Sequence, residues 1–140
     1  MAILVAYDGS EPAQQAAEYA FRQHADDEIV LLRVVEAAEG YTGASVNYVQ
    51  DALKDRQEEV SGTLREEIAE LASNPDVEFR TETTIGRPDN EVVAFAEDES
   101  NDIDHIIVGS HGRAGVSRAL LGSIAEKIVR RAPVPVTVVR

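Results

Sequence analysis

Apolar runs alternate with amphipathic stretches along the whole chain. Five short runs rich in Val, Ile and Leu have the length of β-strands. Between them, apolar residues recur every three or four positions, which is typical of helices that cover a sheet with one face. This pattern predicts strands over residues 2–7, 28–35, 77–85, 103–109 and 134–139. It predicts helices over residues 12–21, 48–73, 88–100 and 123–132.

Two of these strands have the features of sheet edges. In residues 77–85, apolar or Thr positions alternate with Glu and Arg, so one face of that strand is exposed to solvent. Pro135 cannot donate to a β-ladder, which favours an edge for the last strand. Alternating strands and helices predict an α/β fold in a single domain, residues 1–140: a doubly wound, Rossmann-like, five-stranded parallel sheet with helices on both faces. With these two strands as edges, the strand order is 3-2-1-4-5 in chain numbering.

This order brings the carboxyl ends of the first and fourth strands together. Open parallel sheets bind ligands outside the carboxyl ends of their strands, where the strand order reverses. That point lies between Tyr7-Asp8-Gly9 and Val108-Gly109. We therefore expect Asp8 to face the glycine-rich segment that follows the fourth strand. There it binds a ribose hydroxyl or a phosphate-bound metal, or it simply starts the first helix.

The segment after the fourth strand carries a motif that favours phosphate binding. Gly109, Gly112 and Gly122-Ser123 follow the spacing G-x-x-G, nine residues, G-S, between a buried strand and a helix. Glycines let a backbone approach an anion closely, and free amides at a helix N-terminus attract negative charge. Ser123 and Glu126 fit a capping box with Ser123 at the N-cap, so the Ser123 hydroxyl either caps the helix or contacts a phosphate oxygen. His111 is interpreted as a turn residue, because no partner base or nucleophile is visible nearby.

Charge is distributed unevenly along the chain. The formal net charge is −13, and the 13 basic residues are eleven Arg and two Lys. Residues 1–108 hold 25 acidic and 7 basic side chains, whereas residues 109–140 hold one acidic and six basic ones. The phosphate-binding motif therefore lies in the positive part of the chain, where Arg113 and Arg118 precede the helix. The acidic remainder argues against a nucleic-acid partner and is what adaptation to a salty cytoplasm would produce.

Several classes of protein are excluded by what the sequence lacks. Without cysteine there is no disulfide, thiolate chemistry or cysteine-ligated zinc. The phosphate-binding loop of P-loop ATPases, the G-x-G-x-x-G of dinucleotide enzymes and the G-x-S-x-G of hydrolases are also missing. No apolar run reaches the length of a transmembrane helix, and the N-terminus does not resemble a signal peptide. We expect a cytoplasmic protein with no membrane partner, no catalytic residue and no metal site of its own.

These motifs together resemble the universal stress protein family, in its ATP-binding subclass. The match covers essentially the whole chain. Gly109-Ser110-His111-Gly112, nine residues, Gly122-Ser123 follows the family's ATP-binding pattern without a substitution. Further matches are the first strand ending in Asp8-Gly-Ser, Gly86-x-Pro88, and the run from Ala132 to Val136 before a terminal valine strand. Ala6-Tyr7 departs from the family, which frequently has a smaller or proline-containing pair before the aspartate.

The resemblance implies an adenine nucleotide, ATP or a relative, bound with Mg²⁺. Asp8 would lie by the ribose, Val34 or Val35 by the base, and the glycines with Ser123 around the phosphates. Tyr7 would narrow the slot for the adenine. The predicted nucleotide-binding residues are Ala6, Tyr7, Asp8, Val34, Val35, Val108, Gly109, Gly112, Arg113, Gly122, Ser123 and Ile124.

The resemblance also implies a partner and a role. Family members commonly form homodimers by antiparallel pairing of the last strand, which carries Val136, Val138 and Val139 here. An apolar strand at an open edge invites such pairing. The function expected is a nucleotide-binding regulatory protein of the universal stress response. A weak ATPase on the same fold and a dimeric signalling or interaction module without a nucleotide remain alternatives.

Overall fold

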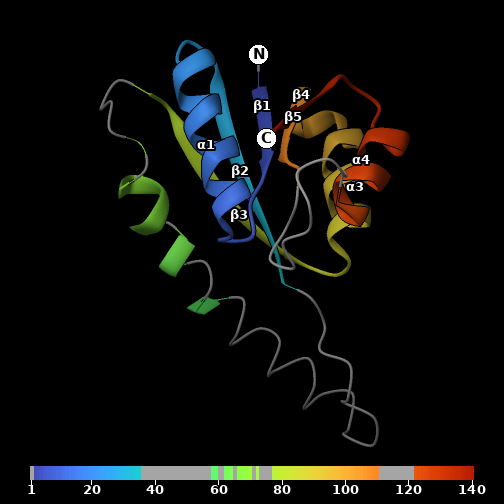
Figure 1. Ribbon diagram of the computed structural model, residues 1–140, viewed down its shortest axis with the longest axis horizontal. Coiled ribbons are helices and arrows are strands. Elements are labelled where there is room, and N and C mark those ends of the chain that lie inside the picture. The colour runs from blue at the N-terminus through green and yellow to red at the C-terminus, as the bar shows by residue number, and fades with distance from the viewer. Residues whose placement is uncertain are drawn as a thin grey trace, which may run out of the picture.

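The computed structural model describes residues 2–35, 58–59, 62–64, 66–70, 72, 77–110 and 122–140. These residues form one twisted parallel sheet with helices on both of its faces (Figure 1). In the described part of the chain, no helix is long and apolar enough to cross a membrane.

The sheet has the predicted strand order, β3-β2-β1-β4-β5. Its central strand, β1 (Ala2–Ala6), pairs with β2 (Glu28–Val35) on one side and β4 (Ile103–Gly109) on the other. The edges are β3 (Phe79–Ile85) and β5 (Val136–Val139), and all four pairings are parallel. The expectation that the alternating third strand and the last strand lie at the edges is therefore confirmed.

Helix α1 (Glu11–Gln23) covers one face of the sheet, and α3 (Pro88–Glu97) and α4 (Ser123–Arg131) cover the other (Figure 1). Residues 58–59, 62–64 and 66–70 are helical too, within the predicted 48–73 helix, and Leu64 and Ile68 are buried as its apolar stripe predicts. The inner face of α1 is mostly alanine, which lets the helix lie close to the strands.

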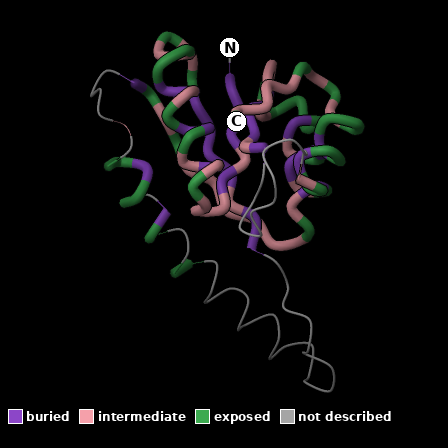
Figure 2. Tube along the Cα trace, in the orientation of Figure 1, coloured by how far each residue is buried: buried purple, intermediate pink, exposed green. Residues whose placement is uncertain are grey.

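Each face of the sheet has its own apolar core. Alternate side chains of a strand point to opposite faces. Ile3, Val5 and Ile107 therefore join the α1 core, whereas Leu4, Ile106 and Val108 join the core under α3 and α4. Figure 2 shows the buried residues concentrated along the strands and on the inner sides of the helices.

Several predicted boundaries were wrong by one to three residues. The third helix ends at Glu97 rather than near Ser100, and a 3-10 turn, η1 (Glu99–Asn101), follows it. Asp98 causes this break, because its Oδ1 accepts hydrogen bonds from the amide (3.0 Å) and hydroxyl (2.6 Å) of Ser100. These bonds hold the pKa of Asp98 below its ordinary value. The third strand begins at Phe79 and the last one after Pro135.

Candidate functional site

The carboxyl ends of β1 and β4 lie side by side, as the predicted switch point requires. The parallel register pairs Leu4 with Ile106 and Val5 with Ile107. Continuing that register by one residue places Ala6 beside Val108. The strand order therefore brings the Asp8 turn and the segment after Gly109 to the same edge of the sheet.

Three predicted apolar residues come together on the face covered by α3 and α4. Val34, Ala6 and Val108 come from the adjacent strands β2, β1 and β4, and all three belong to one apolar cluster. Val34 and Val108 are buried, Ala6 is half-buried, and Ala125 in the first turn of α4 belongs to the same cluster. This part of the predicted site is an apolar strip at the carboxyl edge that leads to the start of α4.

Tyr7 points to the opposite face. Its ring is buried in the α1 core beside Leu64 and Ile68, and its hydroxyl donates to Glu67 Oε2 at 3.1 Å. Burial and the bond to Glu67 raise the pKa of Tyr7 far above its ordinary value. The Tyr7 amide donates to the Leu32 carbonyl at 3.0 Å. Its side chain therefore anchors the end of β1 to a neighbouring helical segment.

Asp8 shapes the turn between β1 and α1. Its Oδ1 accepts from the Ser10 amide at 2.9 Å and also from the Ser10 hydroxyl. Ser10 is the N-cap of α1 and accepts from the Ala13 amide at 3.3 Å, while Gly9 takes a left-handed φ of 81°. The alternative in which Asp8 itself caps the helix is wrong by two residues. Asp8 instead orients the residue that does.

Gly109 lies against the first turn of α1. A Cβ on Gly109 would lie 2.7 Å from both the carbonyl carbon and the carbonyl oxygen of Pro12, and 2.9 Å from the Pro12 Cβ. No ordinary side chain fits in that space without moving the backbone. The glycine at this position is therefore required by helix–strand packing, independently of any ligand.

The start of α4 is held at the end of β4. Ser110 is buried; its amide donates to the Val139 carbonyl at 2.9 Å, and its carbonyl accepts from the Gly122 amide at 2.6 Å. One of the amides expected to hold phosphate, that of Gly122, is thus occupied by the protein. Gly112 and Arg113 of the predicted site lie outside the described residues.

The predicted capping box at the start of α4 was wrong. Gly122 is the N-cap, Ser123 is the first helical residue, and no side chain among the described residues caps the helix. Glu126 lies too far along to reach back, and its carboxylate pairs with Arg130 at 2.8 Å. The helix α4 therefore begins with backbone amides that no described side chain caps, with Ser123 and Ile124 exposed beside them.

Val35 also belongs to the predicted set, and its carbonyl accepts from the Gly86 amide at 3.0 Å. Its side chain is almost fully buried. Between the two candidate residues for contact with a base, Val34 is therefore the one grouped with Ala6 and Val108.

Two polar clusters were missed at the sequence level. Asp89, in the first turn of α3, is buried and pairs with Arg131 at 3.3 Å and Arg87 at 3.6 Å. His105 lies within β4, close to His24, which follows the last turn of α1. Asp89 and Arg131 are 42 positions apart in the chain, and His24 and His105 are 81 positions apart. No local sequence pattern therefore indicates either contact. Among the described residues, no group of three or more His, Cys, Asp or Glu side chains could hold a metal ion.

Comparison with known proteins gives one consistent family. The model of the universal stress protein family matches residues 1–140. Universal stress protein MJ0577 of Methanocaldococcus jannaschii is 31% identical over 153 residues, covering 99% of this chain and 93% of that protein. A solved structure of MJ0577 superimposes with a TM-score of 0.75 and 32% identity, covering 99% and 94% of the two chains. Universal stress protein UspA from Lactobacillus plantarum gives a TM-score of 0.83 at 26% identity, covering 100% and 97%.

Two more distant structures share the fold and contain nucleotides. A universal stress protein in complex with cAMP has a TM-score of 0.62 and 20% identity, covering 100% of this chain and 96% of that one. An Arabidopsis thaliana family member with AMP bound has a TM-score of 0.60 and 17% identity, covering 99% and 90%.

Proposed function

The chain belongs to the universal stress protein family, and on that premise we propose that it is a regulatory protein that binds an adenine nucleotide, ATP in the first instance, between β1 and β4. The observation that carries the proposal is the N-terminus of α4. In the part of the chain that the structure describes, it has no side-chain cap, and it is fixed to the end of β4 by the bond from Gly122 to Ser110. An uncapped helix N-terminus at the switch point of a parallel sheet is a favourable position for a phosphate.

The base and ribose would occupy the other end of the same edge. The apolar strip formed by Ala6, Val34 and Val108 leads toward the start of α4. Asp8 lies in the turn after β1, at the same edge of the sheet, and a carboxylate is suited to bind ribose hydroxyls. The cAMP and AMP complexes of more distant relatives support an adenine nucleotide as the ligand class.

Magnesium would bind as a complex with the nucleotide. The described residues offer no set of three carboxylate or histidine ligands, so the phosphate oxygens would supply most of the coordination. Each contact between a helix terminus and a phosphate contributes roughly 0.3–2 kcal/mol. Several such contacts and a buried base would give about −8 kcal/mol, a dissociation constant near micromolar.

A proline substitution at Ser123 tests the helix terminus directly. Ser123→Pro removes one amide donor, and it fits the fold because Gly122 already has an extended backbone, φ −63° and ψ 152°, and proline is favoured at the first helical position. Ser123→Ala, which removes only the hydroxyl, is the matched control. We expect proline to weaken ATP binding roughly 2- to 30-fold more than alanine does, measured by calorimetry in Mg²⁺.

The outcomes of this experiment are distinct. Wild-type protein that binds none of ATP, AMP and cAMP would favour the interaction module without a nucleotide. Equal affinity in the two variants would place any nucleotide away from α4. Turnover of ATP that is lost with Asp8→Ala would favour the weak ATPase. Mass spectrometry of the nucleotide that co-purifies with the protein would identify the natural ligand.

Ionic strength gives a second test of the same proposal. The excess of acidic side chains in residues 1–108 repels a polyanionic nucleotide when salt is low. We expect ATP to bind more tightly as salt rises from low to moderate. Tighter binding at the lower salt concentration would contradict this expectation and would mean that Arg113 and Arg118 dominate locally.

A homodimer through β5 is the proposed assembly, and a cytoplasmic location stays a prediction. β5 is an edge strand in which Val136, Val138 and Val139 are half-buried. Analytical ultracentrifugation of the wild type and of Val138→Lys tests it: the wild type should sediment as a dimer and the variant as a monomer.

A further inference from the structure

Two histidines that are far apart in the sequence meet at the amino-terminal end of the sheet. His24 follows the last turn of α1, and His105 lies in β4, with 5.8 Å between the centres of their rings. This end of the sheet is opposite the carboxyl edge where Asp8 and Gly109 lie. The pair therefore belongs to a different part of the molecule from the proposed nucleotide site.

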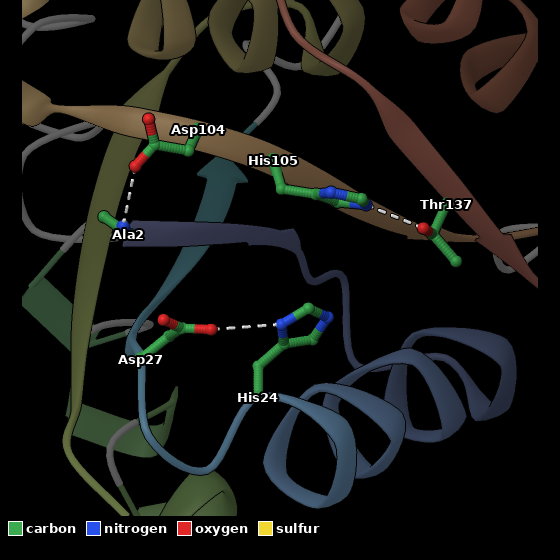
Figure 3. Close-up of polar contacts among 6 residues, drawn as sticks. All are labelled: Ala2, His24, Asp27, Asp104, His105 and Thr137. Atoms are coloured by element: carbon green, nitrogen blue, oxygen red, sulfur yellow. Dashed lines mark hydrogen bonds and ion pairs between the residues drawn. The ribbon is translucent and has the colours of Figure 1, made fainter.

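Each ring is held by a polar partner of its own (Figure 3). His24 Nδ1 lies 3.2 Å from Asp27 Oδ2, and an ionised carboxylate can only accept, so this nitrogen carries the hydrogen. His105 Nε2 lies 2.7 Å from the hydroxyl of Thr137 on β5. The two contacts tie the end of α1, through the pair of rings, to the edge strand.

Charge in this cluster is dominated by the histidines. Around His105, His24 approaches from α1, the neighbour across β1 is the uncharged Ile3, and the contact from β5 is the uncharged Thr137. Asp104, the adjacent carboxylate on β4, is bonded to the Ala2 amide at 3.2 Å. Within the described residues, Asp27 is the acidic group that contacts the pair, and it does so through Nδ1 of His24.

We propose that His24 and His105 form a proton-sensitive switch that couples the end of α1 to the edge strand β5. When both rings are uncharged, they fit together at this separation. Histidine ordinarily takes up a proton near pH 6.5, and two imidazolium ions at this separation repel each other. His105, partly buried, is then driven toward solvent and releases Thr137.

The edge strand is the element that such a release would loosen. β5 has four residues and one neighbouring strand, β4. Two backbone hydrogen bonds lie at the ends of its ladder. The Ile106 amide donates to the Pro135 carbonyl, and the Ser110 amide donates to the Val139 carbonyl. A short edge strand opens at low free energy, so the loss of one side-chain bond measurably changes its exposure.

The direction of the pH effect follows from His105. Burial and the nearby His24 lower its pKa below the ordinary value. The unfolded chain therefore takes up the proton before the folded one does. The contribution of His105 to stability is complete above pH 6.5 and is lost as the pH falls below it.

The test combines a titration with hydrogen exchange. The ring resonances of His105 are followed by NMR from pH 8 to pH 4.5 in the wild type and in His24→Gln, and amide protection of residues 136–139 is compared at pH 7.5 and pH 5.5, corrected for intrinsic rates. We expect His24→Gln to raise the titration midpoint of His105 toward its ordinary value. We expect acid to lower the protection of β5 several-fold in the wild type, and not in the variant.

Two further variants separate the steps. Thr137→Val keeps the shape of the side chain and removes the hydroxyl, so it should abolish the effect of acid on β5 while His105 still responds to His24. His111→Gln removes the third histidine and should change neither readout. A His105 midpoint that His24→Gln leaves unchanged would overturn the proposal, and so would β5 protection that is equal at both pH values. If His24→Gln does not fold, the wild-type titration of His105 still decides, because a coupled pair titrates more broadly than a single site.

Discussion

Replacing Gly109 by alanine tests the claim that packing, and not only a ligand, requires glycine at the end of β4. The added Cβ would lie 2.7 Å from two backbone atoms of Pro12. Backbone atoms cannot rotate away as the end of a flexible side chain can, so β4 or the first turn of α1 must move. The backbone angle of Gly109 is not in the left-handed region, so the cost is steric.

The magnitude follows from the size of the overlap. Forcing one extra carbon into a closely packed region costs roughly 1–3 kcal/mol. For a domain of this size that corresponds to a fall in Tm of roughly 3–10 °C. Urea unfolding of Gly109→Ala without nucleotide measures this cost directly, because no ligand contributes to it.

Gly62→Ala is the matched control. Gly62 is helical and exposed, and nothing lies within 4 Å of the position its Cβ would take. Alanine is favoured over glycine inside a helix, so this variant should be more stable by about 0.5–1 kcal/mol. A Gly109→Ala protein as stable as the wild type would refute the packing argument, and its glycine would then have to be explained by a ligand.

Three other changes have expected outcomes that urea unfolding or spectroscopy can check. Ser10→Ala removes the N-cap of α1 and should cost about 1 kcal/mol. Tyr7→Phe removes the bond to Glu67 and should also cost about 1 kcal/mol. In an alkaline absorbance titration of the wild type, Tyr7 should stay protonated well above the ordinary pKa of a tyrosine, and its contribution to stability should fall once the pH exceeds 10. Asp89→Asn should cost about 1–2 kcal/mol, since Arg131 is half-exposed and can be rehydrated; no loss would mean that the ion pair is energetically neutral.

The local pattern of apolar and polar residues was sufficient to predict the architecture of this protein. Continuous apolar runs identified the strands covered on both faces, and alternation identified β3 as an edge. From the edges, the strand order and the meeting of the Asp8 turn with Gly109 followed without any coordinates. These features depend on the periodicity of apolar residues, which short stretches of sequence contain, and on the general rules of parallel sheets.

The roles of single residues at the site needed the tertiary structure. The sequence motif predicted one role for Gly109, close approach to an anion, whereas the fold places Pro12 against it. The motif also placed Ser123 at the N-cap, but the bond between Gly122 and Ser110 moves the helix start by one residue. A glycine or a serine has the same local signal in either role, and only its distant neighbours distinguish them.

The sequence by itself determined the fold class, the strand order and the edge of the sheet at which the carboxyl ends of β1 and β4 meet. Only the tertiary structure showed which face of the sheet Tyr7 occupies, that the carboxylate of Asp89 is buried, and that His24 lies beside His105. The physical reason is separation along the chain. Periodicity reports which face of an element is covered, but it carries no information about which side chain from a distant element covers it.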